Sequence, residues 1–159
     1  MIILGIDPGT ATTGYGLIEK DQNRLTLIKY GIISTPAKQD LPIRLATIYK
    51  EINKIIKKNK PDLLACEQIF FFKNTKTAIT VGHARGVILL CAEQNKIPVF
   101  DATPLQVKQA VACYGRAGKE QVQKMVKILL NLKEIPKPDD AADALACAIC
   151  AANSVKSAK

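Results

Sequence analysis

Four acidic residues stand at positions from which a fold could bring their carboxylates together. Asp7 follows the apolar run IILGI, Glu67 ends the similar run DLLACE, and both runs are typical of strands. Asp140 and Asp143 are three residues apart at the start of an alanine-rich segment, which puts both on one face of a helix. Carboxylates that share a cleft repel one another unless protons or cations neutralise them. The pattern therefore predicts a cation site.

The residue types favour a hard cation at this site. The chain has one histidine, and its five cysteines lack the paired CxxC spacing of zinc sites. Oxygen ligands suit Mg²⁺, with Mn²⁺ as the alternative, and two such ions about 4 Å apart can support hydrolysis of a phosphodiester. The residues expected to be both catalytic and metal-binding are Asp7, Glu67, Asp140 and Asp143. Any one acid is more often a helix cap or a solvated group, and Asp139 is expected to be a cap or a supporting acid.

The periodicity of apolar residues predicts the elements that would hold these acids. We expect strands over residues 2–6, 14–19, 25–34, 62–67 and 98–102, and helices over residues 41–58, 75–94, 103–112, 119–130 and from 140 onward. This order predicts one α/β domain, residues 1–159, with helices on both faces of a mixed five-stranded sheet. Side chains at the carboxyl ends of parallel strands meet at one edge of a sheet, so Asp7 and Glu67 would lie together.

Two shorter patterns carry expectations of their own. The turn DPGT, residues 7–10, fits a type II turn, in which Gly9 would have a positive φ. Ala78, Gly82 and Gly86 recur every fourth residue of a predicted helix, and such a stripe lets another backbone come close. The sequence favours packing of this stripe on the sheet, and contact with a second copy of the chain is the alternative.

The net charge of the chain suits a polyanionic partner. Lys and Arg number 23 against 14 Asp and Glu, a formal net charge of +9, which is typical of nucleic-acid-binding domains. A membrane surface would attract the same charge, but no segment is both strongly basic and rich in large apolar residues. No apolar run reaches the roughly 18 residues of a membrane span, and the N-terminus lacks a charged leader. We therefore expect a protein of the reducing cytoplasm whose five cysteines are buried thiols.

Aromatic and basic residues follow Glu67 directly. The segment QIFFFK, residues 68–73, holds three of the four phenylalanines of the chain, and unstacked bases bind to aromatic faces beside cations. Phe70 and Lys73 are the expected nucleic-acid contacts here, although adjacent aromatics can equally pack inside a protein. Lys108 and Lys119, near the loop YGRAGK, could reach phosphates, while any single lysine is more often a solvated charge.

Several motifs, taken together, resemble the RuvC family of crossover junction endodeoxyribonucleases, the bacterial Holliday junction resolvases. These motifs are GIDPGTATTGYG, LACEQIFF, GHARGV, QVKQAV, GKEQVQKMV and DDAADALA, and they extend over nearly the whole chain. The resemblance implies a ribonuclease H-like fold and a homodimer. It also implies paired, Mg²⁺-dependent nicks in strands of like polarity at a four-way DNA junction, during recombination and repair.

The resemblance assigns roles to residues of this chain. It implies that the four catalytic acids are Asp7, Glu67, Asp140 and Asp143. It further implies that Phe70 contacts the junction, that Lys108 and Lys119 lie near the active site, and that residues 75–94 form the dimer helix. The helicase complex of the RuvA and RuvB proteins is the implied partner.

Three other interpretations remain beside a junction nuclease. An actin-like or sugar-kinase lobe has a similar turn after its first strand, but such proteins enclose ATP between two lobes and this chain has the length of one. A ribonuclease H-like nuclease of the YqgF type, acting on RNA, shares the opening turn but lacks the Glu-Gln-aromatic unit followed by a basic loop. A module that binds junctions without cutting them would not need all four acids. We therefore expect a metal-dependent DNA endonuclease, a hydrolase.

Overall fold

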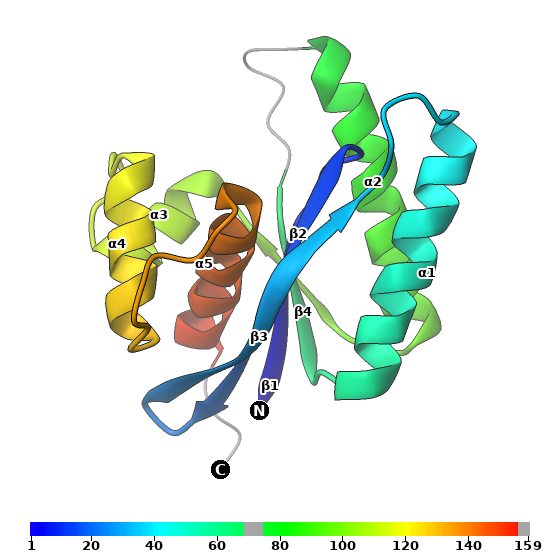
Figure 1. Cartoon of the computed structure of the whole chain (residues 1–159). Helices are drawn as coiled ribbons and strands as arrows, with labels where there is room; N and C mark the ends of the chain where they lie inside the picture. The colour runs from blue at the N-terminus through cyan, green and yellow to red at the C-terminus, as the bar shows by residue number, and fades with distance from the viewer. Residues whose placement is uncertain (69–74, 156–159) are drawn as a thin grey trace.

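The computed structural model of the chain describes residues 1–68 and 75–155, and for residues 75–77 it describes the backbone alone. A central sheet separates two layers of helices (Figure 1). The predicted α/β fold, a mixed five-stranded sheet with helices on both faces, is confirmed. Phe70 and Lys73 lie outside the described residues.

The sheet combines an antiparallel half with a parallel half. Its strands are β1 (Ile2–Asp7), β2 (Thr12–Asp21), β3 (Arg24–Ser34), β4 (Leu63–Glu67) and β5 (Val99–Ala102), in the spatial order β3-β2-β1-β4-β5. β1, β2 and β3 pair as antiparallel neighbours, whereas β4 runs parallel to both β1 and β5. Helices cover β1 and β4 on both faces, which explains why these strands read as nearly continuous apolar runs.

Two helices lie on one face of the sheet and three on the other (Figure 1). The first layer holds α1 (Leu41–Asn59) and α2 (Thr75–Gln94), and the second holds α3 (Pro104–Ala112), α4 (Lys119–Leu129) and α5 (Asp139–Ser154). α1 buries Ile48, Ile52 and Ile56 on its inner face, as the apolar periodicity predicts. α5 lies between the sheet on one side and α3 and α4 on the other. Its residues from Ala144 to Ala152 are all buried.

Glycines on the sheet allow α5 to pack directly against the backbone of β1 and β2. A Cβ atom on Gly14 would collide with the carbonyl oxygen of Asp140. One on Gly5 would come within 2.7 Å of the Ala148 nitrogen and 2.8 Å of the Ala148 Cβ. The alanines of α5 and the glycines of the strands therefore share a close contact that larger side chains would prevent. This contact brings the first turn of α5 beside the end of β1.

The turn after Asp7 differs from the expected type II turn. Gly9 does not have a positive φ, so that expectation is wrong. A Cβ atom on Gly9 would instead collide with the carbonyl oxygen of Thr12, and the Thr13 hydroxyl donates a hydrogen bond of 2.6 Å to the Gly9 carbonyl. Gly9 is needed here because the chain folds back closely on itself.

Two further expectations about packing are wrong in part. Cβ atoms added to Gly82 and Gly86 would meet nothing within 4 Å, so at these positions the small-residue stripe of α2 faces open space and not the sheet. Cys66, Cys91, Cys147 and Cys150 are buried, but Cys113 is exposed because it ends α3 at the protein surface. Within the described ranges, no helix has the length and apolar character needed to cross a membrane.

Candidate active site

Asp7 and Glu67 end two neighbouring parallel strands. Ile6 pairs with Cys66 in the register of β1 and β4, so the next residue on each strand is an acid. Both carboxylates line a cleft of about 210 Å³ between the sheet and α3, α4 and α5. Asp143, on the first turns of α5, lines the same cleft. The sequence predicts that four acids converge, and three of them line this one cleft.

Two lysines from two further helices complete the polar lining of the cleft. Lys108 comes from the middle of α3, and Lys119 is the first residue of α4. The remaining wall is mostly apolar, formed by Ile6, Pro104, Val107, Val122, Ala146 and Cys147. Asp140 does not line the cleft, although its charge raises the pKa of Asp7. The predicted site therefore forms around three of the four acids, with Asp140 at its margin.

Burial and mutual repulsion raise the pKa values of these carboxyl groups. Burial, followed by the charges of Asp143, Glu67 and Asp140, raises the pKa of Asp7 from 3.8 to about 7. Burial is also the main reason that the pKa values of Glu67 and Asp143 are raised. Without a cation, Asp7 therefore holds a proton for part of the time at neutral pH. A divalent cation in the cleft would displace that proton and relieve the repulsion.

Lys119 offsets part of this negative charge in the absence of a metal. Its Nζ lies 3.0 Å from Oδ2 of Asp143 and 3.3 Å from Oδ2 of Asp139. Gln123 donates a 3.0 Å hydrogen bond to the other oxygen of Asp139, and this bond and Lys119 lower the pKa of Asp139. Pro138 is the N-cap of α5, so Asp139 is not a cap but a supporting acid that holds Lys119. The role of Gln123 is not visible in the sequence, because a polar side chain on a helix gives no sign of its partner.

The donor atoms of the cleft are of the type that binds a hard divalent cation, but they lie too far apart to hold one ion together. Carboxylate oxygens at a half-buried site are the ligands that Mg²⁺ and Mn²⁺ prefer. As the side chains lie, however, no three carboxylate, imidazole or thiol groups of the described residues are close enough to hold one ion jointly. Joint binding of one ion by three of these groups therefore requires the carboxylates to move closer together.

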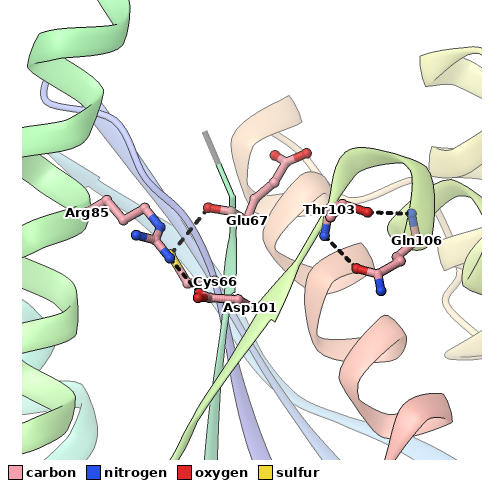
Figure 2. A network of polar contacts seen from close by, with 6 residues as sticks. All are labelled: Cys66, Glu67, Arg85, Asp101, Thr103 and Gln106. Atoms are coloured by element: carbon pink, nitrogen blue, oxygen red, sulfur yellow. Dashed lines mark hydrogen bonds and ion pairs between the residues drawn. The ribbon is translucent and has the colours of Figure 1, made fainter. Parts of the chain in front are cut away.

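A capping box fixes the helix that carries Lys108. The Thr103 hydroxyl accepts a hydrogen bond of 3.1 Å from the Gln106 backbone N–H, and the Gln106 side chain accepts one of 2.9 Å from the Thr103 backbone N–H (Figure 2). Thr103 is the N-cap that the sequence predicts. Its partner Gln106 was missed, although the spacing Thr-x-x-Gln indicates such a box.

Comparison with known proteins identifies the family. Residues 3–151 match the family model of the crossover junction endodeoxyribonuclease RuvC. The chain belongs to the RuvC family. The RuvC of Desulfitobacterium hafniense is 61% identical over 98% of this chain and 94% of its own length. The RuvC of Halothermothrix orenii is 58% identical over the same shares.

A solved structure of a RuvC protein has the same fold. The T. thermophilus RuvC in complex with a Holliday junction substrate superimposes with a TM-score of 0.88 at 32% identity, covering 96% of this chain and 94% of the other. The chain is thus a nuclease of the RuvC family with a ribonuclease H-like fold. Family membership favours the junction nuclease over the RNA nuclease and the ATP-binding lobe that share the opening turn.

Proposed function

We propose that this chain resolves four-way DNA junctions by hydrolysing one phosphodiester bond in each of two strands of like polarity. The observation that carries the proposal is the cleft that gathers Asp7, Glu67, Asp143, Lys108 and Lys119 in a chain of the RuvC family. Three repelling carboxylates need a cation, and two ammonium groups beside them suit the charge of a phosphate. Nucleases of this family are metal-dependent, and we propose Mg²⁺, two ions for each site.

The proposed roles follow from position and charge. Asp7, Glu67 and Asp143 would hold the metal, with Asp140 joining them from the margin of the cleft. The bound ions would neutralise the scissile phosphate and activate the attacking water. Lys119 would exchange its contact with Asp143 for one with the phosphate when the metal binds. Burial raises the pKa of Glu67, and the Lys108 ammonium group offsets part of that rise, which favours the ionised carboxylate that a cation would bind.

Phe70 and Lys73 are proposed to contact the unpaired bases and the backbone of the junction. They lie outside the described residues, so this role stays a prediction from the sequence. In the sequence they follow shortly after Glu67, which lines the cleft. Their position in the chain is consistent with contact to DNA near the cleaved bond.

We propose that two copies of the chain form a dimer through α2. Ile79 and Leu90 are 61% and 50% exposed, and Gly82 and Gly86, which lie between them on α2, have open space beside them. Small residues flanked by exposed large apolar ones let two helices approach closely. A two-fold symmetric dimer would give one active site for each of the two cuts.

The dimer proposal has a direct test. Leu90→Glu is expected to convert the dimer to a monomer in size-exclusion chromatography with light scattering, because it buries a charge in the contact. Ile128→Glu is the control, since Ile128 is 66% exposed on α4, in the other helix layer. If both variants keep the mass of the wild type, the α2 interface is wrong. The RuvA and RuvB proteins, which the family implies as partners, stay a prediction.

The substrate is tested by offering the protein alternatives. Wild type and Asp7→Asn are incubated with a labelled four-way junction, a linear duplex and an RNA/DNA hybrid, with Mg²⁺ and with EDTA. We expect the wild type to cut the junction at paired positions only with Mg²⁺, and Asp7→Asn to leave it intact. Cleavage of the hybrid in preference to the junction would support the RNA nuclease instead. ATP hydrolysis without nicking would revive the kinase-like interpretation.

A further inference from the structure

Arg85 on α2 forms an ion pair behind the carboxyl end of β4. Its Nη2 lies 2.5 Å from Oδ1 of Asp101 on β5, and Figure 2 shows this contact on the side of the sheet away from the Glu67 carboxylate. Asp101 pairs with Cys66 in the parallel register of β4 and β5, and Glu67 is the next residue. The ion pair therefore ties α2 to β5 at the position where β5 pairs with Cys66 of β4, one residue before a proposed metal ligand.

The ion pair of Arg85 is expected to contribute little to the stability of the fold. The side chains of Arg85 and Asp101 are 21% and 44% exposed, and ion pairs in contact with water contribute little to stability. The Nε atom of Arg85 is buried without a hydrogen-bond partner among the residues that the structure describes. A buried donor without a partner is unfavourable. The arrangement therefore indicates a role for Arg85 other than stabilising the fold.

The strand that Arg85 holds leads directly to Lys108. β5 lies at the edge of the sheet and, in the described part of the chain, pairs with β4 alone. Its last residue, Ala102, accepts a 2.8 Å hydrogen bond from the Gln68 backbone N–H, and α3 begins two residues later. A shift of the β5 end relative to β4 would therefore change the distance across the cleft between the Lys108 ammonium group and the Glu67 carboxylate.

We infer that Arg85 is a positioning residue for cleavage. Through Asp101 it fixes the ends of β4 and β5 relative to α2, and so sets the separation of Glu67 and Lys108. Because Arg85 belongs to α2 and Asp101 to β5, the same contact links the position of α2 to the geometry of the cleft. This inference rests on the proposed function, in which Glu67 binds metal and Lys108 faces the phosphate.

The test separates chemistry from binding. Arg85→Met and Asp101→Asn each break the ion pair, and Arg85→Lys keeps the positive charge. Single-turnover cleavage of a four-way junction is measured at saturating protein with Mg²⁺, and the junction Kd is measured in EDTA. We expect both disrupting variants to cut about 10- to 100-fold more slowly, since small displacements of reacting groups have effects of this size. Their Kd should change by less than about threefold, and Arg85→Lys should recover much of the rate.

A matched pair on α1 controls for the loss of any ion pair. On the exposed side of α1, Nζ of Lys54 lies 2.6 Å from Oε1 of Glu51. Lys54→Met should leave the cleavage rate and the junction Kd unchanged. If a disrupting variant unfolds, the double exchange Arg85→Asp with Asp101→Arg tests the same contact, and recovered cleavage supports the inference. Wild-type rates in folded Arg85→Met and Asp101→Asn overturn it and leave the proposed function intact. A wild type that cuts no junction overturns the proposed function itself.

Discussion

Replacing Asp7 with asparagine is expected to stabilise the metal-free protein while it abolishes cleavage. Asp7 is held among other carboxylates, and its pKa rises from 3.8 to about 7 in the folded protein, first through burial and then through Asp143 and Glu67. Since one pKa unit corresponds to about 1.4 kcal/mol, ionised Asp7 opposes folding by at most about 4 kcal/mol. Asparagine has nearly the same shape and carries no charge, so it removes this repulsion.

The sign of the pH dependence follows from the raised pKa. The folded state holds the Asp7 proton more tightly than the unfolded chain does, so the unfolded chain ionises first as the pH rises. The contribution of Asp7 to stability is therefore most favourable below pH 3.8 and is lost as the pH rises to about 7. Asp7→Asn lacks the titrating group, so its stability does not fall for this reason. The free energies of unfolding of the two proteins should therefore diverge between these pH values.

Urea unfolding in EDTA, followed by circular dichroism at several pH values, measures the effect. After allowance for relaxation around the charged side chain, we expect Asp7→Asn to exceed the wild type by about 2 to 4 kcal/mol at pH 8, and by little near pH 4. Asp139→Asn is the control, because contacts with Gln123 and Lys119 lower the pKa of Asp139 and its loss should not stabilise the protein. If Asp7→Asn is no more stable than the wild type at pH 8, the argument from buried repulsion is wrong.

Three further predictions follow from the cleft and its supports. Mg²⁺ affinity, measured by isothermal titration calorimetry, should rise about fivefold from pH 6 to pH 7 and level off above pH 8, because binding displaces the Asp7 proton, whose pKa is about 7. Gly14→Ala should lower the free energy of unfolding in urea by about 1 to 3 kcal/mol and slow cleavage, because its Cβ displaces the start of α5. Lys119→Met should slow single-turnover cleavage about 100-fold through loss of the charge facing the phosphate, with little change in far-UV circular dichroism; wild-type rates in either variant would contradict its assigned role.

The sequence predicts the elements of this fold well because burial leaves a clear apolar pattern in each of them, a continuous run in a covered strand and a helical spacing in an amphipathic helix. The apolar runs of β1 and β4 end at Asp7 and Glu67, and both acids lie where parallel strands bring them together. The acid Asp143 at the start of α5 is equally visible, whereas the same pattern predicts a place in the cleft for Asp140, which does not line it. These features depend on local pattern and on one rule of sheet geometry, so no knowledge of the packing is required.

The remaining parts of the site depend on contacts that no local pattern records. Gly14 is needed because the backbone of α5 passes against it, and the sequence shows only a glycine in a strand. Asp139 looks like a helix cap in the sequence. Its contacts with Lys119 and Gln123 of α4, the preceding helix, make it a supporting acid instead. Gly9 fits a common turn by its residue type, while the structure uses it for close approach to Thr12. In each case tertiary packing decides the role.

The central claim is that the carboxylates of the cleft bind the metal that cleavage requires. The most direct measurement compares Asp143→Asn with Asp139→Asn, two changes of the same kind in acids that share Lys119. Single-turnover cleavage of a four-way junction is followed over a range of Mg²⁺ concentrations. We predict that Asp143→Asn loses at least about 1000-fold in rate and that more Mg²⁺ does not restore it, while Asp139→Asn stays within about tenfold of the wild type. Equal rates for the two variants would contradict the account.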